Sequence, residues 1–199
     1  LSMTLLRRSS VAAAAVAVSS LVGVQVQAKP VVQVFNTGIT EAEVDQMQKG
    51  WCDAVLAISA AYQDGGYDAG RAKAAAVIDS AYAYNYGPVA FKPTYATGAG
   101  TFRTTRDGAL AYFVGPDPSI ALYRGKKLGF ATYRHWVKCE IKDEVVQLFG
   151  NTANTMGQVI LTDSDGQTAE PEKTWTFLRE IDGSIRIVLH HSSAPFDAR

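Results

Sequence analysis

The sequence has few of the residues that build metal and redox sites, with two cysteines and three histidines among 199 residues. Cys52 and Cys139 form no Cys-x-x-Cys pair, so they cannot supply a zinc site of four thiolates. Both lie in segments of apolar pattern, which favours buried free thiols. A disulfide in an oxidising compartment stays open, and so does a zinc site made by both cysteines and a histidine.

Excess charge of either sign is also absent, because 19 Lys and Arg balance 19 Asp and Glu. Binding to nucleic acid needs a basic patch, and binding to a membrane surface a basic amphipathic stretch. The sequence has neither, so we expect no nucleic acid and no membrane as partners of the mature form. The length suits one domain with its own core, and no internal repeat is present.

The N-terminal segment has the layout of an export signal. Arg7 and Arg8 precede an uncharged run that ends in small residues at Ala28, and no acidic residue occurs before Glu41. We therefore expect residues 1–28 to be an export signal or targeting segment and residues 29–199 to be a single domain. The expected location is the periplasm in a bacterium or the plastid in an alga. Since the chain begins with Leu1, we also expect that it can be part of a longer precursor.

Two helices are predicted to open the domain. Thr40 and Glu43 have the spacing of a capping box, and apolar residues follow at steps of three and four up to Tyr62. The glycine pair at 65–66 ends this helix. A second helix is predicted from Asp68 to about Tyr84, where a following Gly-Pro pair stops it.

Strands are predicted after Pro88, at residues 89–94, 109–114, 128–136, 145–149, 155–161, 174–178 and 184–193, with a turn at 163–166. The segment 137–141 is predicted to continue or follow the strand at 128–136. Helices followed by a run of antiparallel strands predict an α+β fold, with N-terminal helices covering a curved antiparallel sheet. Such an arrangement leaves a cone-shaped cavity that is open at one end. Nothing in the glycine-rich segment 98–100 resembles a nucleotide-binding loop, because no helix or lysine of the required kind follows it.

The last predicted strand carries the candidate site. Asp182-Gly183 is typical of a tight hairpin turn with positive φ at both residues. Alternation then places His191 and Ser193 on the apolar face of the strand, and His190 and Ser192 on the other face. The apolar face thus ends in an imidazole and a hydroxyl, as the wall of a pocket would. A solvated strand end is the plainer interpretation of the same residues.

Two other chemistries fit the sequence poorly. His190 and His191 are adjacent, so on a strand they cannot easily share one metal ion. A serine nucleophile would need an elbow of the Gly-x-Ser-x-Gly kind, which the chain lacks.

Several motifs in order resemble the iota-class carbonic anhydrases, which belong to the family of the calcium/calmodulin-dependent protein kinase II association domain. The resemblance covers residues 39–196 and is carried by Phe91-Lys-Pro-Thr94, Phe102-Arg-Thr-Thr105, Ala111-Tyr-Phe-Val-Gly115, Met156-Gly157 and His190-His-Ser-Ser193-Ala-Pro195. It implies a cone-shaped fold like that of nuclear transport factor 2 and the reversible hydration of carbon dioxide to bicarbonate. It also implies a homodimer, or pairing with a neighbouring repeat of a longer precursor. No cofactor is expected, with manganese or zinc left open.

The resemblance further implies a catalytic set of Thr94, Tyr112, His191 and Ser193. The three hydroxyls would hold the water and the bicarbonate oxygens, and His191 would relay the proton. Lys92, Arg103, His190 and Ser192 are expected to bind substrate. A non-catalytic association or small-ligand-binding module of the same fold is the alternative, and an isomerase or dehydratase, which needs a carboxylate base, is another.

Overall fold

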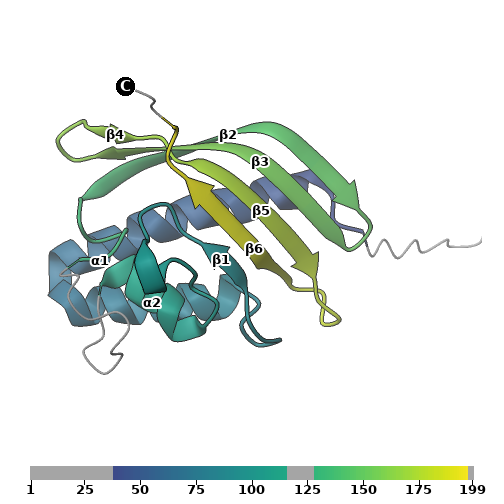
Figure 1. Cartoon of the computed structure of the whole chain (residues 1–199), viewed down its shortest axis with the longest axis horizontal. Coiled ribbons are helices and arrows are strands. Elements are labelled where there is room, and N and C mark those ends of the chain that lie inside the picture. Colours follow the sequence, from purple (N-terminus) through teal and green to yellow (C-terminus); the bar gives the residue numbers. More distant parts are fainter. Residues whose placement is uncertain (1–37, 116–127, 197–199) are drawn as a thin grey trace, which may run out of the picture. The chain divides into compact units, whose positions relative to one another are not determined.

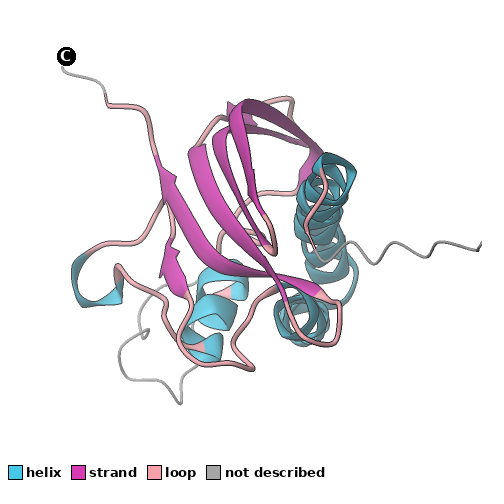
Figure 2. Ribbon diagram, turned by 90° about the vertical axis from the view of Figure 1, so that its right-hand side faces the viewer, coloured by secondary structure: helices cyan, strands magenta, loops and turns pink. Residues whose placement is uncertain are grey.

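A curved sheet forms one layer of the fold, and helices pack against it (Figures 1 and 2). The structure, a computed structural model, describes residues 38–115 and 128–196, so the predicted targeting segment lies outside the described residues. The strand order is β1-β6-β5-β3-β2, and β4 pairs with β3. Only the pairing of β1 with β6 is parallel among the pairings that the described strands make. The predicted α+β fold with a curved antiparallel sheet is confirmed.

The helix α1 (Glu41–Ala81) runs behind the sheet in Figure 1. Its N-terminus has the predicted capping box, in which the Thr40 side chain accepts the Glu43 N–H and the Glu43 carboxylate accepts the Thr40 N–H. Gly66 has a φ of 71°, outside the helical range, so α1 consists of two helical segments that meet at a kink. The two predicted helices are therefore present. The second ends at Ala81, a few residues earlier than expected.

The segment predicted as a strand at 109–114 is instead the helix α2 (Arg106–Val114). The Thr105 hydroxyl accepts the Gly108 N–H at 3.1 Å and caps its N-terminus. Every residue from Gly108 to Val114 is buried. A helix that is buried all round shows no periodicity of 3.6 residues, which is why its short apolar run was mistaken for a strand.

The segment 128–135, also predicted as a strand, forms turns that attach to α2. The Phe130 and Ala131 N–H groups donate to the carbonyls of Tyr112 and Phe113, each at 2.8 Å. Gly129 permits this approach, because a Cβ there would lie 2.4 Å from the Phe113 backbone.

The remaining strands are β1 (Ala90–Lys92), β2 (Trp136–Phe149), β3 (Thr152–Asp163), β4 (Thr168–Ala169), β5 (Glu172–Arg179) and β6 (Ile185–Ser193), and a short 3₁₀ helix, η1, spans Gly98–Gly100. Two predicted strands, at 137–141 and 145–149, form the single long strand β2. Gly183 between β5 and β6 has the expected positive φ of 89°. Asp182 does not, because every non-glycine residue in the described ranges has a negative φ.

A disulfide joins Cys52 on α1 to Cys139 on β2, with a Cα–Cα distance of 5.4 Å. The prediction of buried free thiols is therefore wrong. The zinc alternative also fails, since a metal would need the two thiolates that this bond consumes. The disulfide attaches the first helix directly to the edge strand of the sheet.

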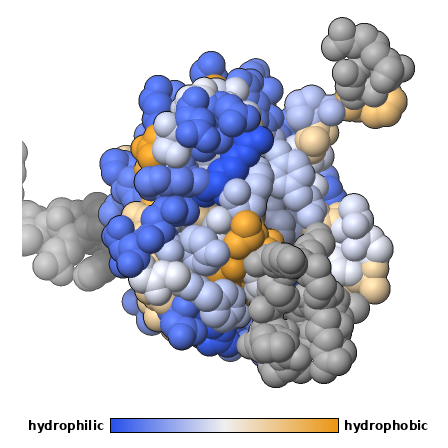
Figure 3. Space-filling model, turned by 90° about the vertical axis from the view of Figure 1, so that its left-hand side faces the viewer, coloured by the Kyte–Doolittle hydropathy of each residue, from blue (hydrophilic) through white to orange (hydrophobic). Residues whose placement is uncertain are grey.

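The face in Figure 3 is mostly hydrophilic, and its hydrophobic side chains form small, separate patches. Over residues 38–115 and 128–196, no helix combines the length and the hydrophobicity needed to cross a bilayer.

Candidate active site

At the polar end of β6, the side chains that face the interior are the ones predicted to face outward. His190 and Ser192 are each 1% exposed, whereas His191 is exposed and Ser193 is partly exposed. The cause is an irregularity in the β5–β6 pairing, where Thr176 pairs with Leu189 but the next residue, Phe177, pairs with Ile187. The extra residue on β6 is Val188, and beyond it the residues that face the interior change from odd to even numbers.

His191 and Ser193 therefore lie on the outer side of the strand. The Ser193 hydroxyl donates to the Glu172 carboxylate at 2.7 Å, in an exposed contact. The predicted inward placement of this pair is wrong by one residue, and the imidazole and hydroxyl that reach the interior belong to His190 and Ser192.

Neighbouring strands add to this interior set through their register. Lys173 on β5 pairs with Ser192, and Trp175 pairs with His190. Phe91 on β1 pairs with His190 from the other side and stacks on its ring, with the ring centroids 4.5 Å apart. Paired residues on adjacent strands share a face, so these side chains all point into the interior.

A hydrogen-bonded chain runs through this interior. The Trp51 indole N–H donates to the Tyr82 hydroxyl at 3.2 Å, and that oxygen lies 2.9 Å from Nδ1 of His190. On the other side of the imidazole, Nε2 lies 3.1 Å from Nζ of Lys173. These four residues thus form one buried polar network within an aromatic core: Trp51 on α1, Tyr82 directly after α1, His190 on β6 and Lys173 on β5.

Burial shifts the pKa values of this network strongly. It lowers the pKa of Lys173 to about 7, and the charge of Lys92 contributes to the lowering. It lowers the pKa of His190 well below its usual value, with smaller contributions from Lys173 and His191. Because His190 does not take up a proton at neutral pH, its ring is a neutral imidazole.

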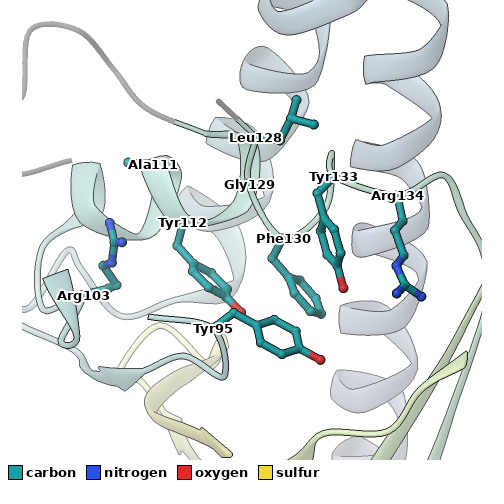
Figure 4. A pocket seen from close by; sticks show the side chains of 9 residues that line it. All are labelled: Tyr95, Arg103, Ala111, Tyr112, Leu128, Gly129, Phe130, Tyr133 and Arg134. Carbon is teal, nitrogen blue, oxygen red and sulfur yellow. The ribbon is translucent and has the colours of Figure 1, made fainter. Parts of the chain in front are cut away.

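A pocket of about 340 Å³ opens beside this network, in front of α2 (Figure 4). Aromatic side chains dominate its wall, and it is lined by Tyr95, Arg103, Ala111, Tyr112, Leu128, Gly129, Phe130, Tyr133 and Arg134. The rings of Tyr112 and Phe130 stack at a centroid distance of 5.6 Å. The rings, with Leu128 and Ala111, give the wall apolar surface that suits a small apolar substrate, and Arg103 and Arg134 add positive charge to it.

Tyr112 brings an unsatisfied hydroxyl to this wall. The residue is only 6% exposed, and among the described residues its hydroxyl oxygen completes no hydrogen bond of ordinary geometry, although the Tyr95 backbone and the Thr94 side chain lie near it. Burial raises the pKa of Tyr112, and the Tyr95 backbone and the Thr94 side chain lie close enough to offset that rise only in part. The phenol is therefore neutral, and its O–H is available to a bound molecule.

Thr94 joins the pocket to the end of β6. Its hydroxyl forms a hydrogen bond with the Ser192 hydroxyl. Nζ of Lys92 donates to the Ser192 carbonyl at 2.8 Å. Arg103, which is 3% exposed, lines the pocket and donates to the Gly108 carbonyl at 3.3 Å.

The structure thus brings together Thr94, Tyr112, His190 and Ser192 of the predicted residues, with Lys92 and Arg103 at the edge of this set. The prediction missed Lys173, Tyr82 and Trp51. A signal for Lys173 was present, since it shares the apolar face of β5 with Trp175 and Phe177, where a lysine is out of place.

Metal ligands are not grouped in the described part of the chain, where no three or more His, Cys, Asp or Glu residues stand close enough to hold an ion. His190 is surrounded by Phe91, Tyr82, Trp175 and Lys173, and none of these supplies a carboxylate.

Comparison with known proteins agrees with this geometry. Residues 42–194 match the family described as metal-independent carbonic anhydrase (MICAH). A metal-independent carbonic anhydrase from Nostoc sp. (strain PCC 7120 / SAG 25.82 / UTEX 2576) is 48% identical over 164 residues, which are 82% of this chain and 78% of the relative.

Among solved structures, the iota-carbonic anhydrase from a cyanobacterium complexed with bicarbonate superposes with a TM-score of 0.79 at 48% identity, over 84% of this chain and 99% of that one. A putative calcium/calmodulin-dependent protein kinase II association domain from Xanthomonas campestris is more distant, with a TM-score of 0.49 at 21% identity over 84% of this chain and 100% of that one. The matches confirm the resemblance carried by the motifs of β1, α2 and β6, and the chain belongs to the metal-independent carbonic anhydrase family as an enzyme of the iota class.

Proposed function

We propose that the pocket beside Tyr112 is where this carbonic anhydrase, a lyase, hydrates carbon dioxide reversibly. The observation that carries the proposal is the buried Tyr112 hydroxyl, which completes no hydrogen bond of ordinary geometry among the described residues and belongs to the wall of an aromatic pocket, near Thr94 of the Thr94–Ser192 pair. The cyanobacterial relative of 48% identity that was solved with bicarbonate supports it.

In this reaction the oxygen of a water molecule attacks the carbon of carbon dioxide. One C–O bond forms, the electrons of one C=O π bond move to an oxygen, and the water gives up a proton. Tyr112 is a neutral donor, so its O–H is suited to stabilise the oxygen on which negative charge develops. Phe130, Leu128 and Ala111 supply the apolar surface that carbon dioxide needs.

We assign the binding of the attacking water to the Thr94 and Ser192 hydroxyls. Two hydroxyls that share a hydrogen bond leave one O–H and several lone pairs for a third oxygen, so they can orient a water for attack. Arg103, at the pocket wall, supplies a positive charge that favours the bicarbonate product. The water-holding role predicted for Ser193 passes to Ser192, and the imidazole that reaches the interior is His190 instead of His191.

The doubled sequence of β6 offers a matched test. Ser192→Ala should lower the hydration rate, since it removes one of the two water-orienting hydroxyls, whereas Ser193→Ala should leave the rate unchanged. Hydration is measured by stopped flow with a pH indicator, in buffer that contains a chelator. Equal losses in both variants, or a loss confined to Ser193→Ala, would contradict the assignment.

Tyr112→Phe tests the phenol directly. Removing a donor to a developing oxyanion costs about 100-fold to 1,000-fold in kcat. Tyr86, which is 60% exposed, provides the control Tyr86→Phe with the same chemical change outside the pocket. Full activity of Tyr112→Phe would sink the proposal.

We further propose that the enzyme is exported, to the periplasm of a bacterium or the plastid of an alga, and that residues 1–28 are removed. The Cys52–Cys139 disulfide supports this, because such bonds persist in oxidising compartments. Mass spectrometry of the N-terminus of protein recovered from the organism tests it, with an uncleaved N-terminus as the contrary result.

We also propose a homodimer that uses β2, with a neighbouring repeat of a longer precursor as the alternative partner. This edge strand exposes several large apolar side chains, namely Val137, Val145, Val146, Leu148 and Phe149. Exposed apolar edge strands tend to be covered by a partner. Sedimentation equilibrium of the purified chain would show a monomer if the proposal is wrong.

A further inference from the structure

Lys173 is a buried lysine without a counter-ion. It is 3% exposed, and its Nζ lies over the Trp51 ring at 4.9 Å and over the Phe130 ring at 5.6 Å from the centroids. In the ranges that the structure describes, no Asp or Glu forms an ion pair with it. Glu172, its neighbour in sequence, contacts Ser193 on the outer side of the sheet.

Hydration needs a group that accepts a proton, and the pocket offers few. Burial raises the pKa of Tyr112, so this phenol is not a base. The Thr94 and Ser192 hydroxyls are not bases at neutral pH, and neutral His190 has both ring nitrogens engaged, with Tyr82 and Lys173. The amine of Lys173 is the remaining basic group. Lys173 and Ser192 are paired residues of β5 and β6, so their side chains share a face of the sheet, and the hydrogen-bond partner of Nζ there is His190.

We propose that Lys173 is the buried proton acceptor of the hydration reaction and that it acts through Ser192 while His190 positions it. This inference rests on the proposed function and deepens it. The proton leaves the attacking water for the Ser192 oxygen. The Lys173 side chain turns from His190 towards the Ser192 hydroxyl on the same face, takes the proton of that hydroxyl, and becomes an ammonium. In the dehydration direction the same steps run in reverse.

His190 fits the protonated form of this lysine. An ammonium can only donate, so protonated Lys173 donates to Nε2 of His190, and the Nδ1–H of His190 then donates to the Tyr82 hydroxyl. The imidazole is neutral, so it accepts that hydrogen bond without bringing a second positive charge. Lys173 does not line the pocket, so it is a positioning and proton-storing residue rather than one that touches the substrate.

The charged groups around Lys173 set the pH range in which it works. Burial is the main cause of its lowered pKa, and Lys92 on β1 adds repulsion. His190 and Tyr82 are the other titratable groups of the network, and His191 acts on His190 from outside. Hydration requires the neutral amine, so the hydration rate should rise with pH through a midpoint near 7, the pKa of Lys173.

Lys173→Met tests the inference, because methionine keeps an unbranched apolar side chain but has no amine. We expect kcat for hydration at pH 8 to fall about 100-fold, the magnitude typical of lost acid–base catalysis, and the rise near pH 7 to disappear. The affinity for bicarbonate, followed by calorimetry, should change by less than about twofold, since other residues bind the anion. Lys138→Met is the matched control at a surface position, where the side chain is 60% exposed and pairs with Glu140.

A second variant addresses the titration itself. Lys92→Met removes the like charge near Lys173, so the midpoint of the rise in hydration rate should move to higher pH. If Lys173→Met keeps the rate and pH profile of the unchanged enzyme, the inference is wrong. A midpoint that does not move in Lys92→Met also counts against it.

The unchanged enzyme provides a test that does not depend on the folding of a variant. With lysines labelled with ¹⁵N, one side-chain signal should titrate near pH 7 together with the hydration rate, far below the ordinary lysine pKa of about 10.4. If every lysine titrates near 10, Lys173 is not the acceptor. If the unchanged enzyme shows no hydration at all, the proposed function fails, whatever the lysine signals show.

Discussion

The disulfide between Cys52 and Cys139 makes a large and measurable contribution to stability. The two residues are 87 positions apart, so the bond closes a long loop in the unfolded chain. The entropy of closing a loop of that length corresponds to about 4.5 kcal/mol at 25 °C, and disulfides commonly deliver about 2–4 kcal/mol. Whole domains are stable by only about 5–15 kcal/mol, so the loss of this bond is a substantial fraction of the total.

The perturbation is the double variant Cys52→Ala, Cys139→Ala, compared with the unchanged protein in urea. All three tryptophans are buried, at 4% exposure or less, so their fluorescence reports unfolding. We expect the free energy of unfolding to fall by about 2–4 kcal/mol. The slope m should rise, because a chain without the bond exposes more surface when it unfolds.

A reductant separates the bond from the loss of two side chains. It should destabilise the unchanged protein and leave the double variant unaffected, since the variant has no bond to reduce. Equal unfolding curves of the unchanged protein with and without reductant would refute the reasoning. So would two reactive thiols detected in the unreduced, unfolded protein.

Three further predictions concern the fold and its dependence on pH. Gly157→Ala should lower the free energy of unfolding by about 1–3 kcal/mol, because a Cβ there would lie 2.1 Å from the Lys142 carbonyl oxygen; an unchanged melting temperature would contradict this. Hydrogen bonds from Arg179 lower the pKa of Glu43 from 4.5 to about 2. The free energy of unfolding should therefore fall as pH drops from about 4.5 towards 2, and the fall should be smaller in Glu43→Gln. Equal acid titrations of the two proteins would refute this prediction. The pKa of Lys173 is 10.5 in the unfolded chain and about 7 in the folded chain. The free energy of unfolding should therefore rise with pH between these values, by at most about 1.4 kcal/mol per pH unit. Lys173→Met should lack that rise when denaturation of the two proteins is compared across this pH range.

Local signals in the sequence were enough to predict much of the fold. The capping box at Thr40 and Glu43 located the start of α1, and the Gly65-Gly66 pair located its kink. The Asp182-Gly183 turn located the last hairpin, although only Gly183 has positive φ. These features depend on residues close together in sequence, which is why they can be read without knowledge of the fold.

Tertiary contacts decided the segments that were mispredicted. The helix α2 is buried all round, so its sequence carries no amphipathic pattern. The pairing of Cys52 with Cys139 depends on the approach of α1 to β2, and neither segment alone predicts it. Each error arose where packing against distant residues outweighed local preference.

The candidate site was predicted in part. The structure brings together Thr94 and Tyr112, which the motifs single out, and the last strand carries a buried imidazole and a buried hydroxyl close to them. Counting alternate residues failed only because Val188 is an extra residue in the pairing with β5. Lys173 was missed because a lysine on a strand is ordinarily a sign of the solvent side.

The doubled ending His190-His191-Ser192-Ser193 has a consequence for how this chain tolerates change. A shift of the strand end by one position, through gain or loss of the bulge at Val188, would exchange the two copies and still point one ring and one alcohol inward. Most strands would lose their interior chemistry after such a slip. In this chain the repeated His and Ser would keep an imidazole and a hydroxyl in the interior whether or not the bulge is present.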